Sequence, residues 1–202
     1  MNHSHNATLL TAISGRADLT AGIRVASVCF MTILTAAAAQ ISVPLPFTPV
    51  PLTLQPMIVL LGGAALGSRL GMMSQVLYLA AGIAGLPVFA ASPALPSGIL
   101  RLLGPTGGFL MAYPFAAFLT GWLAERGFDR RYLTSVVAMA AGLTVIFACG
   151  ILWLAWFAAP ARVGLARALS LGLYPFIVVD VVKVLLAAAV LPSTWWIVGR
   201  HR

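Results

Sequence analysis

Two charged residues stand inside an otherwise apolar run near the C-terminal end of the sequence. Asp180 and Lys183 are surrounded by valines, and Lys183 is the only lysine among 202 residues. Residues three apart project from the same face of a helix. An isolated charge at the centre of a membrane helix costs about 2.5–3.5 kcal/mol. The pair therefore predicts either a binding role or a structural ion pair in which the two charges neutralise each other.

A third charge, Arg101, lies alone in segment 90–103, whose proline and glycine content is typical of a loop. If a helix begins at Pro175, Asp180 lies about 8 Å below its outer end, within reach of a pocket that faces outward. Arg101 enters from the same side. A carboxylate, an ammonium and a guanidinium together can bind a solute that carries an anion and neutral hydrogen-bonding groups, because arginine offers a planar fork to a carboxylate. The alternative is that Arg101 anchors a loop at the membrane surface.

Other polar residues in apolar surroundings could line the same pocket or satisfy contacts between helices. The candidates are Gln55, Gln75, Tyr78 and Tyr174. No metal site is predicted, because the two cysteines lie in separate apolar stretches and the histidines lie near the ends of the sequence.

The composition predicts an all-α integral membrane protein. Hydrophobic residues make up 61% of the sequence and charged residues 8%, and the mean hydropathy is +1.01. These values lie outside the range of ordinary soluble domains. Because one crossing needs about 20 apolar residues, the chain has room for about six transmembrane helices and no further folded domain.

The expected organisation is one membrane domain over 21–198 between a poorly ordered tail, 1–20, and a short tail, 199–202. Segment 42–53 should be an extended loop, because its four prolines exclude a helix. A short interfacial helix is expected after Pro160. The apolar runs that predict the crossings are 21–41, 54–66, 72–88, 106–124, 133–158 and the stretch that begins at 175.

The net charge of +8 could indicate nucleic acid, but its distribution argues against that partner. Eleven of the twelve basic residues are arginines, which stand singly or in short groups between apolar runs and so look like topology signals. Six crossings put both termini on one side, with eight arginines against three. This bias places both termini in the cytoplasm. The eight are Arg16, Arg24, Arg69, Arg126, Arg130, Arg131, Arg200 and Arg202, and the three are Arg101, Arg162 and Arg167.

The sequence does not predict an enzyme. It contains no HExxH motif, no paired catalytic aspartates and no serine or cysteine with a plausible histidine partner. The phosphate-binding pattern GxxxxGK[ST] is also missing, so any ATP hydrolysis would belong to partner proteins. A secondary transporter or channel remains open, because either could use six helices and a buried charge pair.

Four segments together carry a resemblance to a known family. They are Pro49 to Gln55 (PVPLTLQ), Tyr78 to Phe89 (ending in GLPVF), Gly104 to Leu110 (GPTGGFL), and Pro175 to Ile177 (PFI) followed by Asp180 and Lys183. In these segments the chain resembles the biotin-specific substrate-binding (S) components of energy-coupling-factor (ECF) transporters, the BioY family. Leu52 departs from the pattern, since an aromatic residue is expected there.

The resemblance implies high-affinity biotin binding and uptake, with biotin as the transported ligand and no cofactor. The pocket would lie near the outer surface, partly closed by loop 42–53. Asp180 and Lys183 would bind the ureido ring and Arg101 the valerate carboxylate. A binding subunit for another vitamin is the chief rival within the same class.

The resemblance also implies partners in the bacterial cytoplasmic (inner) membrane: an ECF transmembrane coupling subunit and two cytoplasmic ATPase subunits. In such families a face of small residues on the first helix contacts the coupling subunit. Spacings of four residues, which let helices approach closely, occur here in the first run. Packing within the chain is an equal alternative. The residues are Gly22, Ala26, Thr32, Thr35, Ala36 and Ala39.

Overall fold

A computed structural model describes residues 8–14, 19–91, 98–158 and 163–200 of the chain. Beyond residue 197 only the helical backbone is described. Outside the described residues lie the remaining parts of the expected tails, residues 92–97 of segment 90–103, Pro160 and Arg162.

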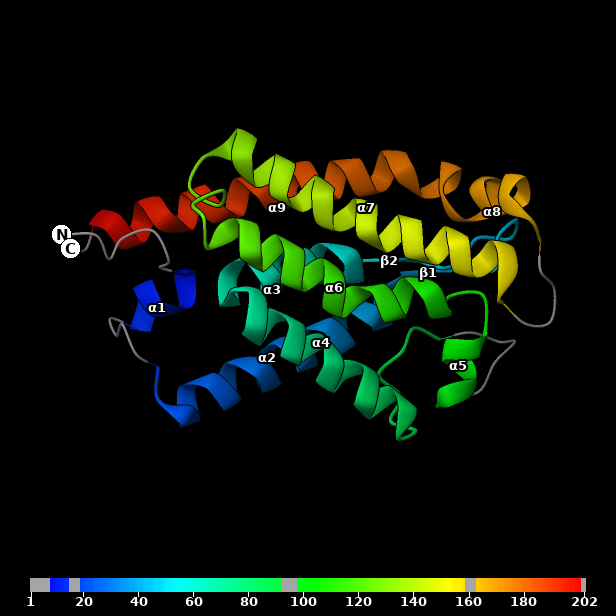
Figure 1. Ribbon diagram of the computed structural model, residues 1–202, viewed down its shortest axis with the longest axis horizontal. Helices are drawn as coiled ribbons and strands as arrows, with labels where there is room; N and C mark the ends of the chain where they lie inside the picture. Colours follow the sequence, from blue (N-terminus) through cyan, green and yellow to red (C-terminus); the bar gives the residue numbers. More distant parts are fainter. Residues whose placement is uncertain (1–7, 15–18, 92–97, 159–162, 201–202) are drawn as a thin grey trace.

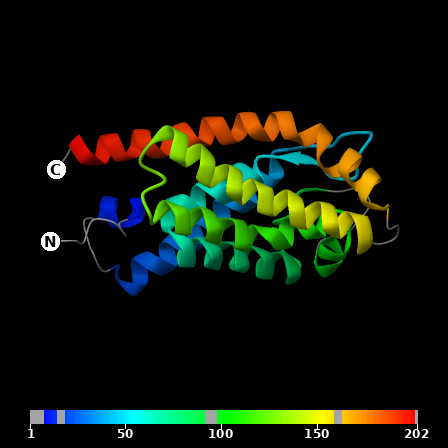
Figure 2. The ribbon, with the colours of Figure 1, turned by 45° about the horizontal axis from the view of Figure 1, so that its top comes forward.

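The described secondary structure is almost entirely helical, as the composition predicts. The long helices are α2 (Ala21–Gln40), α3 (Gln55–Leu66), α4 (Ser68–Ile83), α6 (Gly107–Ala124), α7 (Tyr132–Trp156) and α9 (Tyr174–Arg200). They lie roughly along the long axis of an elongated molecule (Figures 1 and 2). Each corresponds to one of the apolar runs.

Within the described residues, four helices are long and apolar enough to cross a membrane: α2, α6, α7 and the part of α9 up to Ile197. Helix α3 has 12 residues and α4 has 16, so both are shorter than the usual crossing of about 20 residues. The coarse prediction of a helical protein with membrane-spanning segments is therefore confirmed.

Helix α6 forms the centre of the bundle and packs against α3, α4 and α7. Glycines permit the closest approaches, because they bring backbone against backbone without a side chain between them. A Cβ on Gly63 would lie 2.8 Å from Ala117 Cα, and one on Gly71 would lie 2.8 Å from Gly63 Cα. These contacts fix α3, α4 and α6 as one compact unit, while α2 and α9 expose more of their apolar surface.

Several shorter elements complete the structure. Within segment 42–53, β1 (Ser42–Val43) and β2 (Leu52–Thr53) pair antiparallel and make a small hairpin. The short helix expected after Pro160 is present as α8 (Leu165–Gly172). Inside the expected N-terminal tail lies α1 (Leu9–Ser14), whose Leu9 is buried. Arg101 lies on α5 (Ile99–Leu103), a short helix where a loop was predicted.

A buried aspartate joins the turn between α6 and α7 to the far end of α9. Asp129 is 1% exposed, and Trp195 Nε1 donates a hydrogen bond of 2.6 Å to its Oδ2. Its Oδ1 has no hydrogen-bond partner among the described residues. Burial raises the pKa of the Asp129 carboxyl above its ordinary value, because a charged group loses hydration inside the protein.

This raised pKa predicts a pH-dependent stability. Because the folded state favours the protonated acid, ionisation of Asp129 destabilises the fold as the pH rises above the unfolded value of about 4. Asp129→Asn keeps an acceptor for Trp195 without the charge, so it should unfold at or above the wild-type temperature at pH 7.5. That difference should shrink on acidification toward pH 4.

Thermal unfolding of the detergent-purified protein measures this effect. Asp129→Ala is the matched variant, since it leaves the Trp195 N–H without its acceptor, at a cost of about 1–3 kcal/mol. It should unfold below the wild type across the pH range. A difference between wild type and Asp129→Asn that widens on acidification would contradict the assignment.

Candidate functional site

A cavity of about 480 Å³ lies at the end of the bundle that carries the hairpin, α5 and the start of α9. Its volume falls within the range of about 300–1,000 Å³ that is typical of small-molecule sites. Arg101, Asp180 and Lys183 all line it, together with the hairpin segment 48–53. The structure thus brings together the three charges that the sequence singled out.

Asp180 and Lys183 form the ion pair that their spacing predicts. Lys183 Nζ lies 2.7 Å from Asp180 Oδ1 and donates a second hydrogen bond of 2.7 Å to the backbone oxygen of Thr53. The two residues are 5% and 8% exposed, respectively. Because an ammonium has three donors and a carboxylate two acceptor oxygens, the pair can still bind a solute that offers both a carbonyl and an N–H.

Arg101 enters the cavity from α5. It is 6% exposed, and its Nε has no hydrogen-bond partner among the described residues. Burial lowers the pKa of the guanidinium, but arginine titrates so far above neutrality that it keeps its charge. A buried, incompletely paired cation is costly, so this position favours an anionic ligand group.

Aromatic and aliphatic side chains form most of the remaining cavity wall, and they were not identified as site residues from the sequence. They include Phe89, Phe109, Tyr113, Phe147 and Phe176. Three of them belong to the quoted motifs: Phe89 ends GLPVF, Phe109 follows the glycines of GPTGGFL, and Phe176 follows Pro175. The aromatic residues of these motifs were therefore the signal in the sequence from which this part of the cavity wall could have been predicted.

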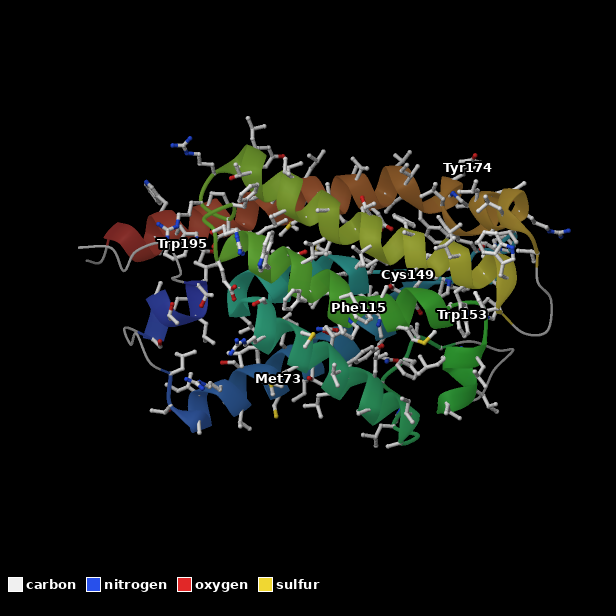
Figure 3. All side chains as sticks on the ribbon, in the orientation of Figure 1. Met73, Phe115, Cys149, Trp153, Tyr174 and Trp195 are labelled. Atoms are coloured by element: carbon white, nitrogen blue, oxygen red, sulfur yellow. The ribbon has the colours of Figure 1, made fainter. Side chains whose placement is uncertain are left out.

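The other polar candidates separate into two groups. Gln55 lines the cavity, and its Nε2 donates a 2.6 Å hydrogen bond to the hydroxyl of the buried Tyr78. Gln75 is buried elsewhere and donates to Thr35 Oγ1. Tyr174 is exposed on the outside of the bundle (Figure 3). Of the four candidates only Gln55 lines the cavity. Gln75 and Tyr78 instead make contacts within the bundle, the alternative that the sequence left open.

The small residues of α2 that were expected to contact a partner lie in two different environments. Thr32 Oγ1 donates to Ser74 O, and Thr35 and Ala39 are fully buried, so this part packs within the chain. Gly22 and Ala26 are exposed, and Ala36 is half-buried. The residues do not form one continuous outward face, because a spacing of four drifts around a helix of 3.6 residues per turn.

Close packing holds α5, and with it Arg101, against the start of α6. Trp153 Nε1 donates a 2.9 Å hydrogen bond to the backbone oxygen of Gly104. A Cβ on Gly108 would collide with Trp153 and lie 2.7 Å from Cys149 O. Gly108 is therefore required by the approach of α7, and Gly107 by the approach of α5, because a Cβ on Gly107 would collide with Leu102 O.

We expect Gly108→Ala to lower stability and weaken ligand binding. Overpacking costs about 1–3 kcal/mol, and the displaced turn would move Arg101. Gly22→Ala is the matched control, because a Cβ there meets no atom within 4 Å. Thermal unfolding and ligand titration of both variants test the prediction. Equal behaviour of the two would show that the close packing at Gly108 is not required.

The helices and the cavity define a class of protein. Long apolar helices that enclose a solute-sized, charged cavity near one end are the architecture of a small-molecule-binding membrane protein. The BioY family model matches residues 10–200. The chain belongs to the BioY family.

Individual relatives agree with this assignment. The chain is 45% identical over 159 residues to the probable biotin transporter BioY of Pyrococcus horikoshii, covering 79% of this chain and 88% of the relative. It is 36% identical to the biotin transporter BioY of Thermotoga maritima, with the same coverage. A crystal structure of the S-component for biotin from an ECF-type ABC transporter superposes with a TM-score of 0.74 at 26% identity, covering 87% of this chain and 94% of that one.

Proposed function

We propose that this chain binds biotin and serves as the substrate-specific subunit of an ECF-type transporter in the bacterial cytoplasmic membrane. The observation that carries the proposal is the convergence of Arg101, Asp180 and Lys183 on one mostly apolar cavity. Biotin has a carboxylate at one end, an apolar chain and ring in the middle, and a ureido group at the other end. The cavity offers a complementary group for each part.

Each charged residue has a role in this proposal. The Arg101 guanidinium binds the valerate carboxylate through its planar fork. Lys183 donates to the ureido carbonyl, and Asp180 accepts from a ureido N–H. The phenyl rings of Phe109 and Phe176 contact the apolar part of the ligand. Gln55 lines the same cavity and adds a further polar group from α3.

The proposed topology has six crossings, both termini in the cytoplasm and the cavity opening to the outside. The distribution of arginines supports this orientation. The turn between α6 and α7 lies at the end opposite the cavity, together with the N-terminal ends of α2 and α4, which carry Arg24 and Arg69 (Figure 1). The single membrane domain would extend over 21–198, and the short α3 and α4 would cross in a locally thinner or distorted bilayer.

Transport would depend on partners: an ECF transmembrane coupling subunit and two cytoplasmic ATPase subunits. The family relationship supports this part of the proposal, together with the exposed Gly22 and Ala26 on α2, which offer a surface for close helix contact. The hairpin 42–53 would partly close the cavity from the outside.

Biotin uptake by cells that lack their own biotin transport tests this function. We expect accumulation of labelled biotin when this chain is produced with a coupling subunit and two ATPases, and little accumulation with ATPase-inactive partners. Equal uptake by the chain alone would instead identify a secondary transporter. If the protein is correctly inserted but takes up no biotin, either alone or with the partner subunits, the proposal is overturned.

A further inference from the structure

The turn between α6 and α7, residues 125–131, turns its acidic groups inward and its basic groups outward. Glu125 Oε1 accepts hydrogen bonds from the backbone N–H and the hydroxyl of Ser68, at 2.8 and 2.9 Å. Asp129 is buried against Trp195. The arginines of the turn, Arg126, Arg130 and Arg131, are all exposed. The surface of the turn is therefore strongly basic although its sequence contains both signs.

Tryptophan rings support two of these guanidinium groups. Arg126 Cζ lies 3.4 Å from the centre of the Trp122 ring, and Arg126 also donates a 2.8 Å hydrogen bond to Trp122 O. Arg130 Cζ lies 4.8 Å from the centre of the Trp195 ring. Such stacking stabilises a guanidinium near an apolar surface.

An apolar stripe leads along α6 directly to Arg126. Phe115, Phe118 and Trp122 are all exposed, and their spacings of three and four place them on one face of α6. Arg126 stacks on the Trp122 ring just beyond the end of the helix. Figure 3 shows Phe115 on the outward side of α6. On α7, the exposed Leu133 adds apolar surface beside the turn. A cationic group thus stands at the end of a continuous apolar strip.

We propose that this turn and stripe bind a phospholipid with an anionic headgroup. The arginines contact the headgroup phosphate, Trp122 lies at the level of the headgroups, and Phe118 and Phe115 contact an acyl chain. Arginine forms charge-assisted hydrogen bonds with phosphate, and tryptophan is enriched at membrane–water interfaces. The charge complementarity and the adjoining apolar strip favour a lipid over a free anion or a protein partner.

The site is separate from the biotin cavity. The turn lies with α1 and the C-terminal end of α9 at one end of the molecule, and the hairpin and α5 lie at the other (Figures 1 and 2). With the proposed orientation, the lipid belongs to the cytoplasmic leaflet. Biotin binding therefore provides an independent check that variants of the turn are folded.

Native mass spectrometry of the full chain, purified in a neutral detergent, tests the proposal. The probes are phosphatidylglycerol and phosphatidylcholine with identical acyl chains. We expect a preference of at least about tenfold for phosphatidylglycerol, since each arginine near the headgroups adds attraction. The triple variant Arg126→Gln, Arg130→Gln, Arg131→Gln should lose the preference and still bind biotin. Trp122→Ala should weaken phosphatidylglycerol binding.

Two controls make the outcomes decisive. The variant Arg24→Gln, Arg167→Gln removes two exposed arginines that do not border the turn and should keep the preference, and inorganic phosphate should not displace the lipid. An unchanged preference in the turn variant, equal loss in the control variant, or displacement by inorganic phosphate would each overturn the proposal. So would a turn variant that keeps its lipid preference but no longer assembles with a coupling subunit.

Discussion

Replacing Lys183 with Met is expected to weaken biotin binding by about tenfold or more. The substitution removes a donor from the cavity and leaves Asp180 buried without its cationic partner. The lost hydrogen bond from a charged donor to the ligand costs about 1.5–3 kcal/mol of binding free energy, and every 1.4 kcal/mol is a tenfold change in affinity. The unfolding temperature should fall as well, because the pair is almost fully buried and Lys183 also holds Thr53 O.

The double variant Asp180→Asn, Lys183→Met separates binding from stability. In the double variant no buried carboxylate is left without a cationic partner. It should therefore unfold at a higher temperature than Lys183→Met, but it should still bind biotin poorly. Calorimetric titration and thermal unfolding measure the two effects. Arg167→Gln, on the exposed surface of α8, is the control for loss of one positive charge. Wild-type affinity in the double variant would assign the pair a purely structural role.

Replacing Arg101 with Gln should weaken biotin binding by roughly 10- to 100-fold, because hydrogen bonds to charged groups contribute about 1.5–3 kcal/mol. The loss should depend on the ligand. Biotin amide, which has no carboxylate charge, should bind wild type and Arg101→Gln with similar affinity. Arg101→Lys should recover part of the biotin affinity, since it keeps the charge but not the planar fork.

Titration of biotin and biotin amide into the wild type and Arg101→Gln forms a thermodynamic cycle that measures the contact between Arg101 and the ligand carboxylate. An equal loss of affinity for biotin and biotin amide would show that Arg101 supports the cavity wall rather than the carboxylate. An unchanged affinity for both ligands would return Arg101 to the role of an interfacial anchor.

The charged part of the site could be predicted from the sequence because charges are rare in a chain of this composition. Asp180 and Lys183 stand out against the valines around them, and a spacing of three sufficed to predict their contact. Arg101 was also identified, but the helix that carries it was not. Five residues are too few to display a helical period, and the proline and glycine residues around them favoured a loop.

The sequence could not predict whether an uncharged polar side chain faces the cavity or a neighbouring helix. Gln55 and Gln75 look alike in sequence, yet one lines the cavity and the other bonds to Thr35 on a neighbouring helix. The apolar residues that line the cavity could not be predicted either. In a membrane protein the outward surface is as apolar as the interior, so Phe109 in the cavity and Phe115 on the outside cannot be told apart by hydrophobicity.

The same limitation affected the small-residue face of α2. Ala26 and Ala39 have identical side chains, but one is exposed and the other is buried. The difference arises from the packing of α4 against the middle and C-terminal part of α2, where Thr32 reaches Ser74 O. Only the tertiary arrangement decides which small residues remain free for a partner.

Isothermal titration of the detergent-purified wild-type protein with biotin tests the central claim most directly, with thiamine and riboflavin as control ligands. We predict saturable binding of biotin and no binding of the two controls. Folded protein that binds no biotin, or that binds thiamine or riboflavin as well as biotin, would contradict the assignment of the cavity.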